Sequence, residues 1–449
     1  MKIGMVSLGC AKNQTDAEIM LGILAQKGHK IVNAPEDAEV IIVNTCGFIT
    51  PAKQESIDTI LEMARYKSEG NCRLLIATGC LSERYNTEME QEIPELDAII
   101  GTGDFDKIEK IIEKAEKGEK ICIFGHQDYT LPENLPRILS TPFYTAYLKI
   151  ADGCDNNCTY CAIPKIRGHY KSRNFEDIIE EAVRLSENGV KELILIAQDT
   201  TRYGIDLYGE PSLARLLEEL CKIEKIHWIR THYFYTEAIT DELIRVMAEN
   251  EKICPYVDMP IQHINNDILR RMARRTNKHQ IEERIKSIRE NIPDVSIRTS
   301  IIAGFPGETD EQFDELLEFV KEIKFDRMGV FAYSKEEDTP AYDFPDQINE
   351  EIKERRKNAL MEIQQKISLA KNKAKIGTVQ EVLCEGYDRD NFMYFGRSRA
   401  DSIDVDGKVY FAADDEVEIG TFVKVEILDA DEYDLTGRTL KERFYEFTQ

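Results

Sequence analysis

The sequence predicts a mixed α/β protein made of a parallel α/β domain, a partial parallel (β/α) barrel and a small antiparallel β-barrel. Strand-like apolar runs alternate with helical patterns near the N-terminus, and the same alternation resumes after a proline-containing stretch. Short β-rich runs separated by Gly and Asp then follow a long charged helix. A chain of 449 residues is long enough for about two to four domains. We expect an N-terminal domain at 1–117, a linker at 118–139, a core at 140–370 and a C-terminal domain at 373–441.

The first 117 residues alternate between strand and helix patterns. Such alternation is typical of βαβ units with a mostly parallel sheet. The expected strands are Ile3–Leu8, Val40–Asn44, Leu74–Thr78 and Ala98–Ile100, and the expected helices are Gln14–Lys27, Pro51–Lys67 and Phe105–Lys117. Little periodicity follows up to residue 139, and Pro132 and Pro136 within that stretch indicate a linker.

The central region repeats a strand followed by a helix about six times, which suits a full or partial parallel barrel. The expected strands are Tyr147–Ile150, Leu193–Ala197, Ile226–Arg230, Tyr256–Met259, Ile297–Ile302 and Asp326–Phe331. The expected helices are Phe175–Glu187, Ser212–Cys221, Asp241–Asn250, Asp267–Ala273 and Glu311–Ile323.

The C-terminal region begins with a long charged helix from Asn349 to Lys375 and continues with β-rich runs, spaced as in a small OB-like antiparallel barrel. The expected strands are Thr378–Glu385, Met393–Arg397, Lys408–Phe411 and Phe422–Leu428. From Lys373 to Gln449 the net charge is −8, whereas an OB-like nucleic-acid binder is normally basic.

Composition limits the class of protein. Hydrophobic residues make up 42% and charged residues 31% of the chain, so we expect packed globular cores. The net charge of −25 repels phosphate backbones and disfavours nucleic acid as the main partner. The N-terminus does not have the pattern of a signal peptide, and no apolar stretch approaches ~20 residues, so we expect a cytoplasmic protein without a membrane span.

Three of the 11 cysteines form a compact motif, Cys154, Cys158 and Cys161, directly after an expected barrel strand. Barrels of this type place their chemistry at the carboxyl ends of the strands. Three thiolates on one loop can bind three irons of a cubane cluster and leave the fourth iron open to a small molecule. The alternative is a set of structural or zinc-bound cysteines, although a structural zinc site would need a fourth Cys or His at suitable spacing.

A second set of cysteines is dispersed in the sequence. Cys10, Cys46 and Cys80 each come just after an expected parallel strand. Ligands of open α/β sheets bind outside those strand ends, so we expect these three thiols to converge in space. The alternative is three buried structural cysteines, which we also expect for the remaining five: Cys72, Cys122, Cys221, Cys254 and Cys384.

The motif from Cys154 to Cys161, with Tyr160 before its last member, resembles the signature of radical S-adenosylmethionine enzymes. Together with Cys10, Cys46 and Cys80 and a small C-terminal β domain of the TRAM type, the whole chain resembles the methylthiotransferase family. It is most similar to the RimO branch, which modifies an aspartate of small-subunit ribosomal protein twelve. Motifs that carry this similarity are Leu8-Gly9-Cys10-Ala11-Lys12-Asn13, Gln198-Asp199-Thr200-Thr201, Pro260-x-Gln262-His263 and Gly304-Phe305-Pro306-Gly307.

The resemblance implies a pocket for S-adenosylmethionine lined by Gln198, Gln262, Arg298, Gly304 and Gly307. Glycines admit close approach of a ligand to the backbone, and an arginine can pair with a carboxylate. Each polar residue has an alternative role, which is to satisfy neighbouring polar groups inside the barrel.

The resemblance also implies two 4Fe-4S clusters. The cluster at Cys154, Cys158 and Cys161 would cleave S-adenosylmethionine to a radical that removes hydrogen from the β-carbon of the aspartate, and these three cysteines are therefore the expected catalytic ligands. The cluster at Cys10, Cys46 and Cys80 would hold the sulfur that is methylated and transferred. The implied partners are a basic ribosomal protein and a reductant such as a flavodoxin or ferredoxin, without a membrane and without nucleic acid as the main partner.

Two other functions remain open from the sequence. A tRNA adenosine methylthiotransferase would share all six cysteines, and only the acidic C-terminal domain and the branch motifs disfavour it. A non-enzymatic iron–sulfur carrier or redox sensor would need neither the barrel nor a substrate domain.

Overall fold

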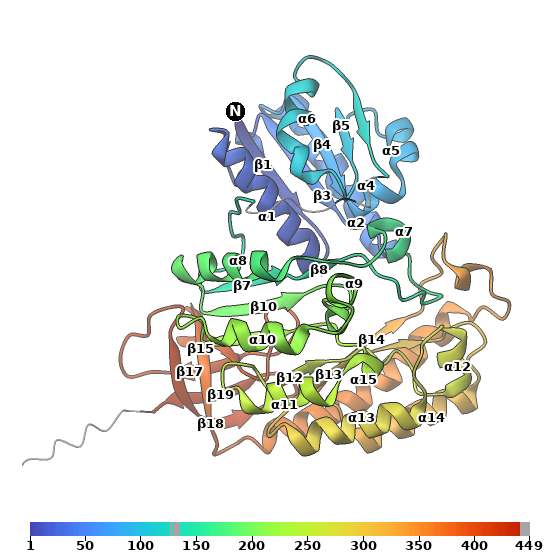
Figure 1. Cartoon of the computed structure of the whole chain (residues 1–449), viewed down its shortest axis with the longest axis vertical. Coiled ribbons are helices and arrows are strands. Elements are labelled where there is room, and N and C mark those ends of the chain that lie inside the picture. The colour runs from blue at the N-terminus through green and yellow to red at the C-terminus, as the bar shows by residue number, and fades with distance from the viewer. Residues whose placement is uncertain (126–128, 130–134, 441–449) are drawn as a thin grey trace, which may run out of the picture. The chain divides into compact units, whose positions relative to one another are not determined.

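The computed structural model describes residues 1–125, 129 and 135–440 (Figure 1). The chain divides into two compact units. The first comprises 1–225, 271–273 and 334–344, and the second comprises 226–270, 274–333 and 345 onward. Part of the expected linker, including Pro132, lies outside the described residues. Within the described ranges, no helix combines the length and the apolar character that crossing a membrane requires.

The first unit begins with a six-stranded sheet whose strands are all parallel, in the order β2-β1-β3-β4-β5-β6. The strands are β1 (Lys2–Ser7), β2 (Lys30–Ile31), β3 (Val40–Thr45), β4 (Leu74–Gly79), β5 (Ala98–Ile100) and β6 (Ile121–Ile123). The helices are α1 (Ala11–Gln26), α2 (Thr50–Ala64), α3 (Tyr66–Glu69), α4 (Cys80–Arg84), α5 (Asn86–Glu92) and α6 (Ile108–Ala115), with 3-10 turns at Pro35–Asp37 and Phe105–Lys107. The predicted parallel α/β domain is confirmed.

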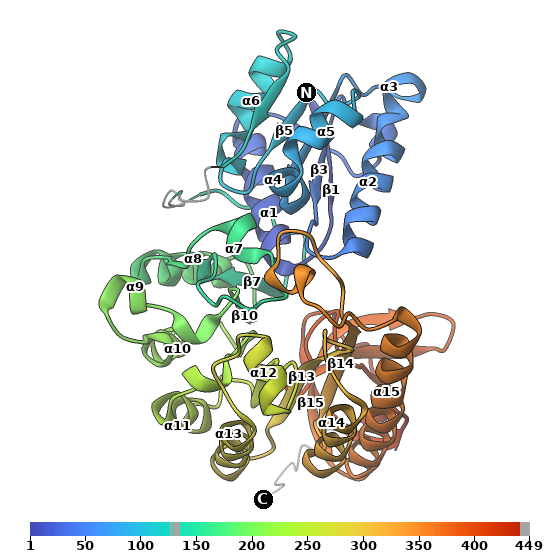
Figure 2. The same cartoon turned by 90° about the vertical axis from the view of Figure 1, so that its right-hand side faces the viewer.

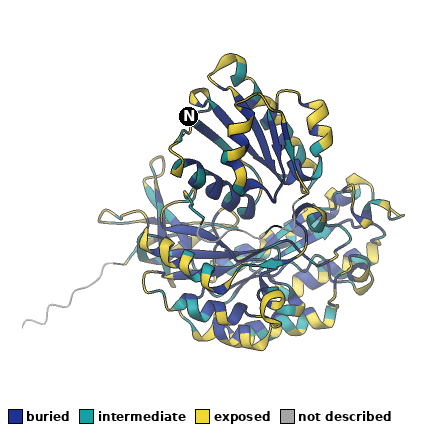
Figure 3. Ribbon diagram, turned by 45° about the horizontal axis from the view of Figure 1, so that its top comes forward, coloured by how far each residue is buried: buried dark blue, intermediate teal, exposed yellow. Residues whose placement is uncertain are grey.

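Successive residues along a strand of this sheet pack alternately into two separate hydrophobic cores, one on each face. Val40 and Ile42 belong to the core on one face, whereas Ile41 and Val43 belong to the core on the other. The strands are therefore apolar without interruption, and Figure 3 shows them buried between exposed helix faces. Strand β6 lies in the segment 118–139 that we expected to be a linker. The expected boundary is wrong there, because residues Ile121–Ile123 pair with β5 and extend the sheet by one parallel edge strand.

The remainder of the first unit holds two parallel strands, β7 (Thr145–Lys149) and β10 (Glu192–Ile196), and a short antiparallel pair, β8 (Ala151–Asp152) and β9 (Lys171–Ser172). Its helices are α7 (Ile163–Arg167), α8 (Phe175–Glu187), α9 (Ile205–Tyr208) and α10 (Leu213–Cys221), with 3-10 turns at Thr200–Arg202 and Pro340–Asp343. The bounds of α8 agree with those predicted from its amphipathic pattern.

The second unit contains β11 (Trp228–Thr231) and a parallel sheet of β12 (Tyr256–Asp258), β13 (Ser296–Ala303) and β14 (Arg327–Ala332). Its helices are α11 (Asp241–Glu249), α12 (Asn266–Arg271), α13 (Lys278–Asn291), α14 (Asp310–Ile323) and α15 (Glu350–Lys373), with a 3-10 turn at Thr236–Ala238. In Figure 2, α14 and α15 lie side by side next to β14. Helix α13 was not predicted: it starts with a capping box at Asn277 and Gln280, but buries only Ile281, Ile285 and Ile288.

The C-terminal strands close into a five-stranded barrel in the order β15-β16-β17-β19-β18. They are β15 (Val379–Asp388), β16 (Met393–Ser398), β17 (Val409–Ala412), β18 (Phe422–Ala430) and β19 (Leu435–Thr439). Alternate residues such as Val382, Cys384 and Val425 fill the interior. The predicted barrel is confirmed, but β19 was not predicted, and its pairing with β17 is parallel while the other pairings are antiparallel.

Candidate cysteine sites

The three dispersed cysteines lie at the carboxyl ends of adjacent strands of the first sheet. Cys10 occupies the N-cap position of α1, Cys46 follows β3 directly, and Cys80 is the first residue of α4 after β4. Glycines let these segments approach closely. A Cβ atom on Gly9 would lie 2.8 Å from Cβ of Cys46, and a Cβ atom on Gly47 would lie 2.7 Å from Cα of Leu81. Packing at these strand ends therefore requires residues without side chains.

The side chain of Asn13 connects these strand ends by hydrogen bonds. Its Nδ2 atom donates to the carbonyl oxygens of Leu8, at 3.1 Å, and Thr45, at 2.7 Å. Its Oδ1 atom accepts from the Cys80 thiol at 3.5 Å. Asn13 belongs to the motif that we identified after Cys10, but only the structure shows that one amide joins the segments of all three cysteines.

The pKa values of the three thiols are shifted in different directions by their surroundings. At Cys10, burial opposes the thiolate, but the positive charges of Lys12 and Arg167 outweigh it and lower the pKa. At Cys80, burial dominates and raises the pKa to about 12, with Arg167 acting in the opposite direction. Burial also raises the pKa of Cys46. A bound metal ion removes such protons outright, because a coordinating thiol is deprotonated.

The compact motif is held on a loop between β8 and α7. The Cys154 amide donates to the Gly168 carbonyl at 3.1 Å, and the Cys161 amide donates to the Cys158 carbonyl at 3.0 Å. The loop is also anchored at Thr159, whose amide donates to the Met272 carbonyl at 3.1 Å. Burial raises the pKa of the Cys154 thiol to about 11.

The two cysteine sites meet at α7. Cys80 of the first site packs against Ala162 and Ile166, which follow the compact motif. The Ile166 carbonyl also accepts from the hydroxyl of Thr102 at 2.8 Å. Both sets of three thiols therefore belong to one compact unit and share one packing element.

The donor set fits iron–sulfur clusters better than single metal ions. Each iron of a cubane cluster takes its own thiolate, so three cysteines need not converge on one point. Among the described residues, no group of three His, Cys, Asp or Glu side chains is placed to share one ion. All 11 cysteines are free of disulfides, so the six predicted ligands are available as thiols.

The residues expected to bind S-adenosylmethionine are distributed over both units. In the first unit, Gln198 follows β10, and its Nε2 atom donates to Asp152 at 2.8 Å. Its Oε1 atom is buried and finds no hydrogen-bond partner in the described part of the chain. A buried acceptor in this state fits a site that a ligand completes.

In the second unit, Gln262 and the glycine turn gather at the carboxyl end of β13. The amide of Gln262, whose φ is 70°, donates to the Ser300 carbonyl at 2.9 Å. Gly304 and Gly307 follow β13 with φ values of 73° and 79°. Packing offers another reason for Gly304, since a Cβ atom there would lie 2.4 Å from Cγ of Lys353.

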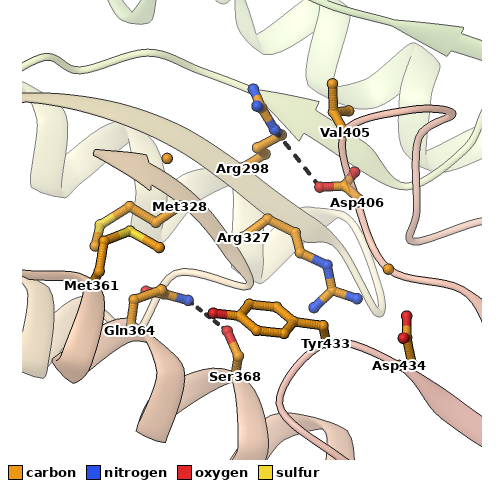
Figure 4. Close-up of a pocket in the computed structure, with 12 residues that line it drawn as sticks. Arg298, Arg327, Met328, Met361, Gln364, Ser368, Val405, Asp406, Tyr433 and Asp434 are labelled. Carbon is orange, nitrogen blue, oxygen red and sulfur yellow. Dashed lines mark hydrogen bonds and ion pairs between the residues drawn. The ribbon is translucent and has the colours of Figure 1, made fainter. Parts of the chain in front are cut away.

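Arg298 lies apart from that group, near the start of β13. Its guanidinium donates to Asp258 at 2.9 Å and pairs with Asp406 at 3.7 Å, as Figure 4 shows for the second contact. It lines a cavity of about 290 Å³ together with Arg327, Met361 and Gln364. The structure thus gives Arg298 two carboxylate partners from the protein and does not bring it together with Gln262 and Gly304.

Comparison with known proteins divides the chain into three regions in the same order as the predicted domains. Residues 2–101 match the model described as uncharacterized protein family UPF0004, residues 148–320 match the radical SAM superfamily, and residues 376–440 match the TRAM domain. A protein named ribosomal protein uS12 methylthiotransferase RimO, from Clostridioides difficile (strain 630), is 55% identical over 442 residues, which are 98% of this chain and 99% of that protein. The chain belongs to the RimO family. The family resemblance predicted from the motifs is therefore confirmed.

Other RimO proteins give the same result. The protein from Thermoanaerobacter sp. (strain X514) is 51% identical over 435 residues, 97% of this chain and 99% of its own. Among solved structures, the radical S-adenosylmethionine methyltransferase TsrM from Kitasatospora setae matches with a TM-score of 0.55 and 13% identity, covering 76% of each chain. At that identity, the likeness to TsrM concerns the fold alone.

Two residues of this RimO family chain gain a place in the site only from the structure. Besides Asn13, Arg167 lies in it, with 4% of its surface exposed and contacts toward both cysteine sites. The sequence signal for Arg167 is weak, because it is one of several basic residues after Cys161, and its partners Asn13 and Asp16 are distant in sequence.

Proposed function

We propose that this chain methylthiolates ribosomal protein uS12 at the β-carbon of an aspartate, as a radical S-adenosylmethionine enzyme with two 4Fe-4S clusters. The observation that carries the proposal is the pair of three-thiol sites within one compact unit, on a chain that matches RimO proteins almost from end to end.

We assign Cys154, Cys158 and Cys161 to the cluster that binds S-adenosylmethionine. The other three, Cys10, Cys46 and Cys80, are assigned to the cluster that serves sulfur transfer. When bound, the clusters and S-adenosylmethionine supply the electron-transfer, radical and sulfur chemistry that an unactivated C–H bond requires and that side chains lack. With three protein ligands at each site, one iron of each cluster would be left for a further ligand.

The protein's own contribution is positioning. Cys154 is hydrogen-bonded to the backbone at Gly168, and Cys80 packs against Ala162 and Ile166, so both cysteine sites are held against the segment around α7. The buried Oε1 atom of Gln198, which has no hydrogen-bond partner among the described residues, supports Gln198 as a proposed contact to S-adenosylmethionine. We retain Gln262, Gly304 and Gly307 as proposed contacts to S-adenosylmethionine and leave out Arg298, whose charge is already paired.

The proposed domain division keeps the boundaries 1–117, 118–139, 140–370 and 373–441. The family matches at 2–101, 148–320 and 376–440 fall within three of these segments and support the division. Strand β6 adds 121–123 to the N-terminal sheet.

The proposed partners follow from charge and chemistry. The net charge of −8 from Lys373 to Gln449 favours a basic protein surface over a phosphate backbone. Reduction of a cluster requires an electron donor, and a flavodoxin or ferredoxin is the proposed class. A ribosomal protein as substrate supports the cytoplasm as the proposed location.

The test is mass spectrometry of ribosomal proteins from cells with and without this chain. We expect uS12 to carry a methylthio group on an aspartate only when the chain is present. Digested tRNA from the same cells provides the second measurement. An unmodified uS12 together with chain-dependent methylthioadenosine would favour the tRNA function, and cleavage of S-adenosylmethionine would exclude a simple iron–sulfur carrier.

A further inference from the structure

We propose that Arg167 is a positioning residue shared by the two cysteine sites, and that its charge raises the reduction potential of the cluster at Cys10, Cys46 and Cys80. This inference rests on the two-cluster function proposed above. It concerns a residue outside the six ligands and outside the expected S-adenosylmethionine pocket.

Arg167 is the last residue of α7 and is almost completely buried, with 4% of its surface exposed. Its guanidinium donates to Oδ1 of Asn13 at 2.5 Å, to Oδ2 of Asp16 at 3.0 Å and to Oδ2 of Asp152 at 2.8 Å. A planar guanidinium can bind several acceptors at fixed angles, which an ammonium cannot do. One side chain therefore connects helix α1 to strand β8.

The contact with Asn13 leads to the first cysteine site. The Asn13 oxygen that accepts from Arg167 also accepts from the Cys80 thiol. The nitrogen of the same amide is bound to the carbonyls of Leu8 and Thr45, which stand next to the segments of Cys10 and Cys46. Arg167 thus determines the orientation of the Asn13 amide group. The amide in turn holds the segments that carry Cys10, Cys46 and Cys80 in place.

The contact with Asp152 leads to the second cysteine site. Asp152 ends β8, shortly before Cys154, and it also accepts from Gln198. The residue after Arg167, Gly168, accepts a backbone hydrogen bond from Cys154. A shift of the guanidinium would therefore disturb hydrogen bonds next to both cysteine sites.

The charges around Arg167 balance before any cluster is bound. Lys149 and Arg167 provide two positive charges, and each of the two carboxylates, Asp16 and Asp152, is paired with both cations. A thiolate-bound cluster adds negative charge, and reduction adds more. In a buried site, a nearby cation stabilises the reduced form more than the oxidised form. Loss of Arg167 would leave two carboxylates facing one cation and the cluster.

The test measures the potential of the first cluster by itself. The full-length chain with Cys154, Cys158 and Cys161 replaced by Ala retains only that cluster, and its reduction is followed by electron paramagnetic resonance during a redox titration. Within this background, we expect Arg167→Gln to shift the midpoint potential to a more negative value. Asp16→Asn removes a negative charge from the same network and should shift it to a more positive value. Arg167→Lys keeps the charge and should stay close to the parent potential.

Arg137→Gln is the matched control. Arg137 is also a buried arginine of the first unit, and it is paired with the carboxylates of Glu18 and Glu181. Its loss should reduce stability to a similar extent without moving the potential. A merely structural effect of Arg167→Gln would appear in this control as well.

Opposite shifts in Arg167→Gln and Asp16→Asn support the inference, whereas shifts of the same sign, or no shift in either, overturn it. If Arg167→Gln does not fold, the comparison of Asp16→Asn with Arg167→Lys decides in the same way, because an unchanged potential in Asp16→Asn overturns the inference. Modification of uS12 by the unaltered chain is measured separately. A failure there refutes the proposed function, whereas normal modification with unmoved potentials refutes only the role of Arg167.

Discussion

At the scale of single residues, the surroundings of each proposed cluster ligand change the pKa of its thiol. Burial raises the pKa of Cys80 to about 12 and that of Cys154 to about 11, so neither is a thiolate near neutral pH in the metal-free chain. Cys10 differs because Lys12 and Arg167 favour its charged form. Cluster assembly must therefore supply the free energy for deprotonating the buried thiols.

Replacement of Cys154, Cys158 and Cys161 together by Ala should remove one cluster and abolish cleavage of S-adenosylmethionine. The physical reason is that each thiolate binds one iron and no other thiol of the described chain is assigned to this loop. Iron content should fall to about half that of the anaerobically reconstituted parent chain. Production of 5′-deoxyadenosine by this variant would show that the radical site has been misassigned.

The complementary change, Cys10, Cys46 and Cys80 to Ala, should separate the two tasks. We expect this variant to cleave S-adenosylmethionine but to yield no methylthiolated uS12, because the cluster assigned to sulfur transfer is absent. Chromatography of 5′-deoxyadenosine and mass spectrometry of uS12 measure the two results on one sample. A full yield of modified uS12 would refute the two-site mechanism.

At the scale of elements, helices α1 and α8 are joined by a buried ion network. Arg137 pairs with Glu18 of α1 and Glu181 of α8, and Arg173 also pairs with Glu181. Although burial disfavours the charged form of Glu181, the two arginines outweigh it and lower its pKa to about 2. The free energy of unfolding therefore depends on this carboxylate being ionised.

This network predicts how stability depends on pH. A lowered pKa in the folded state means that the contribution of Glu181 is complete above the unfolded pKa, near 4.3, and is lost as the pH falls toward 2. Its size is on the order of 3 kcal/mol. The free energies of unfolding of the parent chain and of Glu181→Gln, measured with urea, should differ most between pH 5 and 7. The difference should shrink below about pH 4 and vanish only near pH 2. A constant difference across that range would contradict the assignment.

At the scale of the whole molecule, charge predicts how the substrate is recognised. The exposed residues Asp414, Asp415 and Glu416 extend the negative charge of the C-terminal barrel. Asp431 and Asp434 are less suitable for a test, because Asp431 accepts backbone hydrogen bonds from Tyr433 and Asp434, and Asp434 accepts one from Lys408. Their substitution would disturb the turn before β19 as well as the surface charge.

Changing Asp414, Asp415 and Glu416 to Asn, Asn and Gln should slow modification of uS12 severalfold at low salt. The difference should shrink as salt is added, because exposed charges are screened beyond a Debye length of about 10 Å at 0.1 M. Cleavage of S-adenosylmethionine without substrate should not change. Equal rates of uS12 modification at low salt would indicate that these acids serve only as a solvated surface.

The sequence by itself determined most elements of the fold, because their patterns are local. Helix α8 was predicted with its observed bounds from an amphipathic repeat, and strands β1, β3, β4 and β5 of the first sheet were predicted from continuous apolar runs. Strand β6 was missed because it has only three residues, and it is stabilised by pairing with β5. Strand β19 was missed because Leu435 is its only apolar residue. Helix α13 was missed because its apolar face is narrow.

For the site, the sequence by itself predicted the six cysteines and their two groups, because residue type and the ends of strand patterns can be read directly from the sequence. Only the tertiary structure decided which polar groups surround them. Two partners of Arg167, Asn13 and Asp16, are far away in sequence, and Arg298 is paired with Asp258 and Asp406. Spacing along the chain carries no information about such contacts, because a buried charge is satisfied by whichever groups the packing of separate elements brings within hydrogen-bond distance.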